Sequence, residues 1–142
     1  MILLDTNVVS EAMRPSPAPE VIRWLDALPE SDVWISAVTA AEIRLGIALL
    51  PEGKRRTTLF EMAEQMFQED FSGQCLPFDC EAARDYALIV AERTRRGRPI
   101  SVEDGQIAAI ARIGGLTLAT RNIKDFSGIN ELKLVDPWSA GY

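Results

Sequence analysis

Three carboxylates occupy positions from which acidic side chains could act together: Asp5, Glu42 and Asp104. Asp5 follows the apolar run Ile2–Leu4, which is typical of a strand buried on both faces of a parallel sheet. Open α/β sheets bind ligands at the carboxyl ends of their strands, which is where Asp5 would lie. Glu42 and Asp104 fall where the next predicted helices begin. We therefore expect all three carboxylates at one rim of the sheet.

The chain contains no histidine among its 142 residues. This composition excludes histidine as a general acid or base, Ser–His nucleophiles and zinc sites built on imidazole. Two cysteines are too few for a zinc site made of cysteine alone. Carboxylate oxygens instead favour a hard divalent cation, so the sequence predicts a site for Mg²⁺ or Mn²⁺.

Each carboxylate also has a structural interpretation. Asp5 could cap the turn that follows it. Thr39–Glu42 and Ser101–Asp104 both fit a capping box, in which the acid binds the backbone at the start of its helix. Ion pairing is a further structural role, and three arginines are candidates for it: Arg44, Arg112 and Arg121.

Helical spacing places Glu42 and Asp104 on apolar stripes. The residues that share the face of Glu42 are Val38, Leu45, Gly46 and Leu49. Those that share the face of Asp104 are Ile107, Ala108 and Ala111. Both carboxylates are thus expected to lean toward the core, where a charge is costly unless a cation balances it.

A fourth polar segment, residues 120–126, follows a predicted strand. Asn122 could orient a ligand carboxylate or a water molecule, and Asp125 could add negative charge. The alternative is an Asx turn that leaves Asp125 exposed.

Arginine provides twelve of the fifteen basic residues, although the net charge is −6. Arginine clusters on an acidic protein can still bind a polyanion, because the guanidinium group binds phosphate through two hydrogen bonds. A solvated helix face is the competing interpretation of such a cluster. The candidate contacts for a nucleic acid are Arg44, Arg93, Arg95, Arg96, Arg98 and Arg121.

Strand and helix patterns alternate along the chain, which indicates an α/β fold with a mostly parallel central sheet between two layers of helices. The predicted strands cover residues 2–4, 33–35, 76–78, 116–119 and 133–135. The predicted helices cover residues 7–13, 19–28, 37–50, 54–71, 79–96 and 101–114. The methionines of 54–71 indicate either core packing or a groove for a partner.

We expect one domain spanning residues 1–142, with no membrane segment and a cytoplasmic location in which Cys75 and Cys80 remain reduced core thiols.

Five motifs together resemble the PIN-domain ribonucleases, in particular the toxin subunits of VapBC-type toxin–antitoxin pairs and their FitB-like branch. They are ILLDTN at 2–7, ISAVTAAEIRLG at 35–46, PISVEDGQIAAIA at 99–111, TRNIKDF at 120–126 and DPW at 136–138. The resemblance implies a three-layer PIN fold and a metal-dependent endoribonuclease that leaves 5′-phosphate and 3′-hydroxyl ends. It also implies a cognate antitoxin of ribbon-helix-helix or similar type, a homodimer, and promoter DNA bound only through the antitoxin.

Carried over by position, Asp5, Glu42 and Asp104 match the family's acidic metal ligands, and Thr6 and Thr120 match hydroxyl positions that support them. The fourth acidic position of the family is often Asp, but this chain has Asn122. That difference weakens the case for a second metal ion and leaves Asp125 as the candidate to supply the missing charge. The nature of the RNA target is not implied.

Two other functions fit some of the residues. A PIN-like binding or regulatory subunit with weak catalysis would explain Asn122. A magnesium-dependent phosphatase or phospho-acceptor domain would use Asp5 as the nucleophile, but Asn7 stands where such phosphatases need a second Asp.

Overall fold

A computed structural model describes residues 1–139 and contains one five-stranded sheet. The strands lie in the order β3-β2-β1-β4-β5, and every pairing between neighbours is parallel. Their bounds are β1 Ile2–Leu4, β2 Val33–Ser36, β3 Cys75–Leu76, β4 Thr117–Ala119 and β5 Leu134–Val135. The predicted α/β fold with a central parallel sheet is therefore confirmed.

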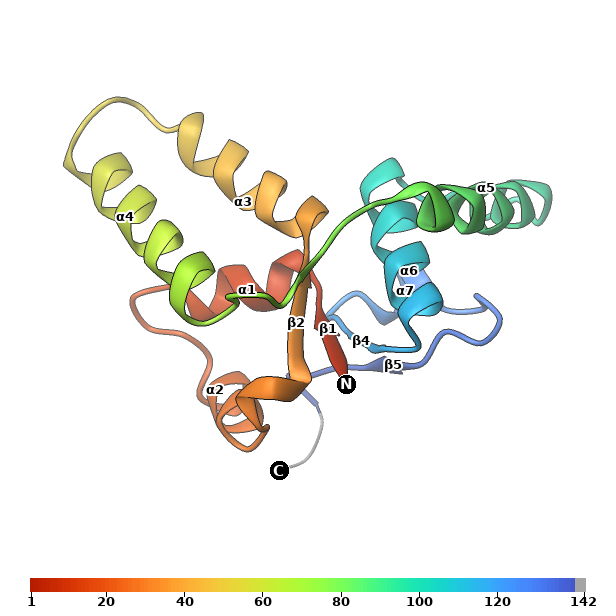
Figure 1. Ribbon diagram of the computed structural model, residues 1–142, viewed down its shortest axis with the longest axis horizontal. Coiled ribbons are helices and arrows are strands. Elements are labelled where there is room, and N and C mark those ends of the chain that lie inside the picture. The colour runs from red at the N-terminus through yellow and green to blue at the C-terminus, as the bar shows by residue number, and fades with distance from the viewer. Residues whose placement is uncertain (140–142) are drawn as a thin grey trace.

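Helices connect the strands and cover both faces of the sheet (Figure 1). Their bounds are α1 Thr6–Ala12, α2 Pro19–Asp26, α3 Ala37–Ala48, α4 Lys54–Glu69, α5 Cys80–Arg95, α6 Val102–Gly114 and α7 Ile123–Phe126. A short 3₁₀ turn, Glu30–Asp32, precedes β2. The sequence predicted α1 to α6 but not α7, because four residues carry no detectable helical period.

Alternation along the strands divides the core into two clusters. Leu3 of β1 and Leu118 of β4 pack with α5, α6 and α7 on one face of the sheet. Leu4, Ile35 and Ala119 pack with α1, α2, α3 and α4 on the other face. This arrangement produces the predicted three layers.

One predicted stripe is buried only at its start. The buried residues of α3 are Thr39, Ile43 and Ile47, whereas Leu45 and Leu49 are 59% and 75% exposed. Of the stripe predicted around Glu42, only Val38 packs against the core, and Glu42 itself is half-buried. The strongly apolar character of α3 concealed its buried face, because apolar residues occur on every side of this helix.

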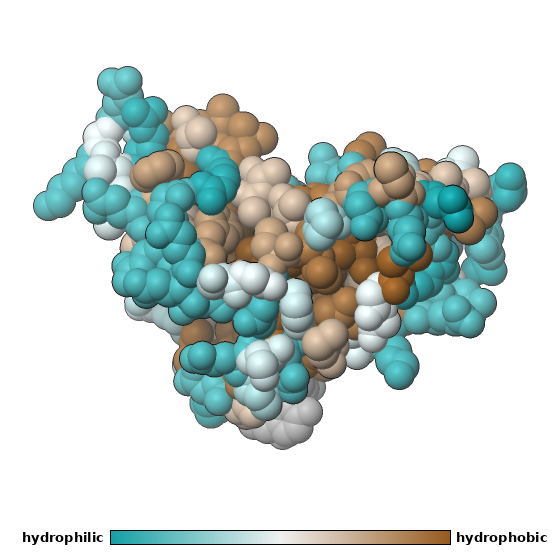
Figure 2. Space-filling model, in the orientation of Figure 1, coloured by the Kyte–Doolittle hydropathy of each residue, from teal (hydrophilic) through white to brown (hydrophobic). Residues whose placement is uncertain are grey.

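In Figure 2 the surface is hollowed between the arm formed by α3 and α4 and the arm formed by α5 and α6. Cys75 and Cys80 are free thiols, as predicted, but both are exposed and so do not belong to the core. Within residues 1–139, every helix is too short or too polar to cross a bilayer.

Candidate active site

The strand order changes direction between β1 and β4, and Asp5 lies at this switch point. Its carboxylate accepts hydrogen bonds from the hydroxyl of Thr120 at 2.7 Å, from the backbone N–H of Thr6 at 2.8 Å and from the amide of Asn7 at 3.1 Å. Asp5 is thus the N-cap of α1, as one prediction proposed. Capping uses one carboxylate oxygen, while Thr120 and Asn7 hold the other across the switch point.

Glu42 is held by the first residue of α1 rather than by its own helix. The Thr6 hydroxyl donates to Oε1 of Glu42 at 2.7 Å and lies 3.0 Å from the hydroxyl of Thr39. The capping box predicted for Thr39–Glu42 is wrong, because α3 begins at Ala37 and the Ser36 hydroxyl accepts from the N–H of Thr39. The hydroxyl of Thr39 is therefore available to hydrogen-bond with the hydroxyl of Thr6.

Asp104 lies in the first turn of α6. Its N–H donates to the hydroxyl of Ser101 at 3.1 Å, so the predicted cap at Ser101 exists. The rest of its apolar stripe is fully buried, as predicted for this helix. Burial, together with the charges of Asp5, Asp125 and Glu42, raises the pKa of Asp104 to about 6, although the hydrogen bond with Ser101 opposes this change. Burial also raises the pKa of Asp5, although its hydrogen bonds oppose that change.

The predicted ion pairs that would neutralise these acids are not formed by Arg44 or Arg112. Arg44 pairs with Glu64 and stacks on the ring of Phe67 at 4.6 Å, on α4. Arg112 binds both carboxylate oxygens of Asp85, at 2.7 and 2.9 Å. Among residues 1–139, no ion pair within 4.0 Å involves Asp5, Glu42 or Asp104.

This donor set fits a hard divalent cation. The acids repel one another through space, and all of their potential ligand atoms are oxygens. In the part of the chain that the structure describes, no three carboxylate or thiolate groups stand close enough together to enclose an ion. The fit therefore rests on the chemistry of the acids and on their unbalanced charge.

Asn122 directly precedes α7, and Asp125 lies within this helix. The N–H of Asn122 donates to the hydroxyl of Thr120 at 3.0 Å, so Thr120 links this segment to Asp5. The Asn122 side chain makes no capping hydrogen bond to α7. Asp125 is exposed, as the Asx-turn alternative expected, yet its charge contributes to the raised pKa of both Asp5 and Asp104.

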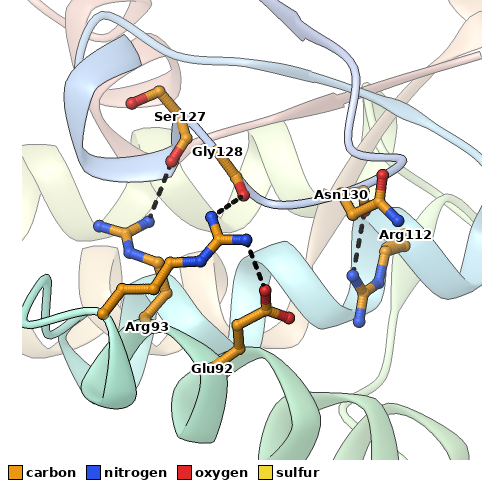
Figure 3. Close-up of polar contacts among 7 residues, drawn as sticks. Glu92, Arg93, Arg112, Ser127, Gly128 and Asn130 are labelled. Carbon is orange, nitrogen blue, oxygen red and sulfur yellow. Dashed lines mark hydrogen bonds and ion pairs between the residues drawn. The ribbon is translucent and has the colours of Figure 1, made fainter.

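Three of the four arginines before α6, namely Arg93, Arg96 and Arg98, bind other groups of the protein. Arg93 is only 6% exposed, and its guanidinium donates to the backbone carbonyls of Arg98, Asp125 and Ser127. Figure 3 shows the contact with Ser127. Arg96 pairs with Glu92 at 2.7 Å, and Arg98 donates to Ser127 at 3.1 Å. This placement argues against Arg93 as an RNA contact.

The remaining candidate arginines differ in their surroundings. Arg44 lies two residues from Glu42 and is occupied by α4, which argues against a role in binding substrate at the acids. Arg95 lines a shallow surface pocket with Arg96 and Arg112, to which none of the acids contributes. Arg121 is exposed and stacks on Trp138 at 4.9 Å, directly after Thr120.

A groove of about 1100 Å³ opens beside the acids, between α1, α3 and α4. Thr6 and Glu42 lie along its wall, and Met62 of α4 lines it with 44% of its surface exposed. The groove also carries three cationic side chains that the sequence did not indicate as functional, namely Arg14, Lys54 and Arg55. Of the two methionines of α4, Met62 lines this groove, whereas Met66 packs against the core, as one of the two interpretations predicted.

Several side chains that order the acids were not predicted from the sequence. Ser36 and Thr39 are fully buried polar residues, and Asn7 donates to Asp5. The available signal was the placement of small hydroxyl residues directly after an apolar strand, where they cap a helix or bind a carboxylate.

Residues 2–132 match the sequence profile of the PIN-domain family, so the chain belongs to that family. It is 46% identical to Toxin FitB of Neisseria gonorrhoeae, covering 97% of this chain and 99% of the relative. It is 40% identical to VapC ribonuclease Y4jK of Sinorhizobium fredii, covering 97% and 98%. The structure of FitAB bound to an IR36 DNA fragment superposes with a TM-score of 0.92 at 44% identity, covering 100% of this chain and 99% of that chain.

Proposed function

We propose that this chain is a single-domain, metal-dependent endoribonuclease that hydrolyses RNA phosphodiester bonds as the toxin of a toxin–antitoxin pair. Asp5, Glu42 and Asp104 bind Mg²⁺ or Mn²⁺ in this proposal. The observation that carries it is the position of Asp5 at the switch point, where Thr120 and Asn7 hold its carboxylate and no ion pair among residues 1–139 neutralises it. The raised pKa of Asp104, to which burial contributes most and the charge of Asp5 next, agrees with it. A site that concentrates unbalanced negative charge at the switch point of a parallel sheet is suited to a cation.

The side chains around the acids act by holding them in place. Thr120 and Asn7 orient Asp5, while Thr6 orients Glu42. Asp125 adds negative charge from α7, which compensates for the neutral side chain of Asn122. When bound, the metal ion supplies positive charge that stabilises the transition state and activates water for in-line attack. The chain has no imidazole to activate the RNA 2′-hydroxyl, and water is the attacking group in this proposal.

RNA contacts come from cations that remain accessible. Arg121 is exposed beside Thr120, and its stacking on Trp138 offers a guanidinium group and an aromatic ring at one place. Arg95, Arg96 and Arg98 would contribute at the edge of the site at most, because Arg96 and Arg98 already bind protein groups. A cytoplasmic location is part of this proposal.

A cognate antitoxin occupies the groove between α1, α3 and α4 in this proposal. Its apolar walls and the cationic side chains Arg14, Lys54 and Arg55 suit an amphipathic segment that carries acidic residues. A segment bound there would cover Glu42 and Thr6, and so would silence the enzyme. The antitoxin is a ribbon-helix-helix protein or a similar one, and promoter DNA is bound only through it. The predicted homodimer stays a prediction, and the exposed Leu45 and Leu49 are the side chains we expect it to cover.

Cleavage of RNA with and without Mn²⁺ tests the proposal. The wild-type chain should produce 5′-phosphate and 3′-hydroxyl ends with Mn²⁺ and no cleavage in chelator. Asp104→Asn should remove activity while the fold survives, and Glu103→Gln, an exposed carboxylate in the same helical turn, should retain it. Undiminished cleavage in chelator would refute the metal-dependent mechanism.

Cleavage, thermal unfolding with Mn²⁺ and a test for phosphorylation of Asp5 together separate the other two functions. A binding subunit would show no cleavage, and a site that cannot take a cation would show no thermal stabilisation by Mn²⁺. A phospho-acceptor domain would form a phospho-aspartate on Asp5. The latter result would replace the nuclease proposal.

A further inference from the structure

Arg93 is buried in the last turn of α5, and its guanidinium joins two segments that are distant in sequence. Its Nε donates to the carbonyl of Arg98 at 2.8 Å, and its Nη1 donates to the carbonyl of Asp125 at 2.9 Å. A longer contact, 3.5 Å, reaches the carbonyl of Ser127. A buried guanidinium needs acceptors for its N–H groups, so these hydrogen bonds hold the Arg93 side chain in place and hold the two segments that supply the carbonyls.

Helix α7, which Arg93 binds, is not stable by itself. Helix α7 has four residues, Ile123–Phe126, which is too short to be stable without tertiary contacts. The carbonyls at the end of a helix lack partners within it, and a cation near them is favourable. Arg93 supplies that partner at Asp125, while the fully buried ring of Phe126 anchors the helix to the core.

Two further arginines bind the same segment from the surface. Arg98 donates to the carbonyl of Lys124 at 3.4 Å and to the hydroxyl of Ser127 at 3.1 Å. Arg96 donates to the carbonyl of Gly128 at 3.5 Å. Both side chains are exposed, so their bonds are weaker contributions than that of Arg93. The cluster as a whole clamps residues 124–128.

We propose that Arg93 is a positioning residue, which by binding the carbonyl of Asp125 fixes where α7 holds the Asp125 carboxylate relative to Asp5 and Asp104. This inference rests on the proposed function, in which Asp125 supplies charge to the metal site. The proximity of the acids agrees with it, since the charge of Asp125 raises the pKa of both Asp5 and Asp104. Arg93 therefore acts through α7 and does not contact substrate.

The substitution Arg93→Lys tests the proposal, because lysine keeps the charge but cannot reproduce the forked guanidinium contacts. We expect hydrogen exchange of the backbone amides in 123–127 to accelerate about 10-fold or more, and Mn²⁺ affinity and kcat to fall about 10-fold, in the range found for residues that support metal ligands. Calorimetric titration with Mn²⁺ measures the affinity without reference to activity.

Arg112→Lys is the matched control. Arg112 also donates a guanidinium hydrogen bond to a backbone carbonyl after α7, that of Asn130 at 3.0 Å, which lies outside residues 124–128 (Figure 3). It should lower thermal stability and leave exchange in 123–127 and Mn²⁺ affinity at wild-type values. Equal effects of Arg93→Lys and Arg112→Lys would show general destabilisation and would overturn the positioning role.

A double-mutant cycle with Asp125→Asn identifies the route of the effect. If Arg93 acts through Asp125, adding Arg93→Lys to Asp125→Asn should change Mn²⁺ affinity by less than twofold. Fully additive effects, or unchanged exchange in 123–127, would overturn the inference. If the wild-type chain neither binds Mn²⁺ nor cleaves RNA, the proposed function fails, whereas the exchange comparison still decides whether Arg93 holds α7.

Discussion

Replacing Asp104 with asparagine should stabilise the metal-free protein at pH 7 although it removes activity. Burial and neighbouring acids raise the pKa of Asp104 from 3.8 to about 6, so its ionised form is unfavourable in the folded chain. A change of that size corresponds to about 3 kcal/mol at most. Because Asp104 is only half-buried, water screens part of the effect, and we expect about 1–2 kcal/mol.

A second effect works against this gain. A carboxylate in the first turn of a helix interacts favourably with the helix dipole, and Asp104→Asn loses about 0.5 kcal/mol of it. Glu103→Gln loses the same interaction without relieving burial, because Glu103 is exposed. The difference between the two variants therefore isolates the cost of burying the Asp104 charge. We expect a melting temperature about 3–6 °C higher for Asp104→Asn than for Glu103→Gln.

The gain should depend on pH. Between pH 3.8 and about 6, the folded chain binds more protons at Asp104 than the unfolded chain does, so wild-type stability falls as pH rises through this window. The advantage of Asp104→Asn should be absent below about pH 4, develop through the window and be complete above about pH 6.

Thermal unfolding in chelator across this pH range provides the measurement. Adding Mn²⁺ should reverse the order at pH 7, because a bound cation stabilises the wild-type chain and not the variant. A loss of stability in Asp104→Asn at pH 7 relative to Glu103→Gln, or a gain of equal size at pH 4, would refute the electrostatic reasoning.

Three more substitutions test the surrounding structure. A Cβ at Gly105 would come within 2.9 Å of a ring carbon on α5, so Gly105→Ala should cost about 1–3 kcal/mol in denaturant unfolding. Thr120→Val removes the hydroxyl that holds Asp5 and accepts from the N–H of Asn122. It should weaken Mn²⁺ binding about 10-fold by calorimetric titration and cost about 1–2 kcal/mol of stability. Asp85→Asn leaves the half-buried Arg112 without its carboxylate and should cost about 2 kcal/mol by thermal unfolding, independently of Mn²⁺.

The sequence carried most of the fold because its local patterns agree with one another. Helices α1 to α6 and all five strands were predicted within a few residues, and Ser101 was recognised as part of a helix cap. The start of α3 was assigned to the wrong cap, since Ser36 and Thr39 are both plausible and only the backbone conformation selects Ser36. Helix α7 could not be predicted from the local sequence, because tertiary contacts of Arg93 and of the buried Phe126 stabilise it. Arg93 lies about thirty residues before α7 in the sequence.

The sequence by itself determined which groups the proposed site offers: carboxylate oxygens without histidine, at the carboxyl ends of parallel strands. Residue type and position at a strand end are local properties, and they suffice to predict a hard cation. Only the tertiary structure decided which groups each charge contacts. It turned the side of α3 that carries Leu45 and Leu49 to solvent, and it bound the guanidinium of Arg93 to α7. Both outcomes depend on which surfaces pack together. The sequence cannot distinguish an arginine whose guanidinium binds phosphate from one whose guanidinium binds a backbone carbonyl, because the same donors serve both.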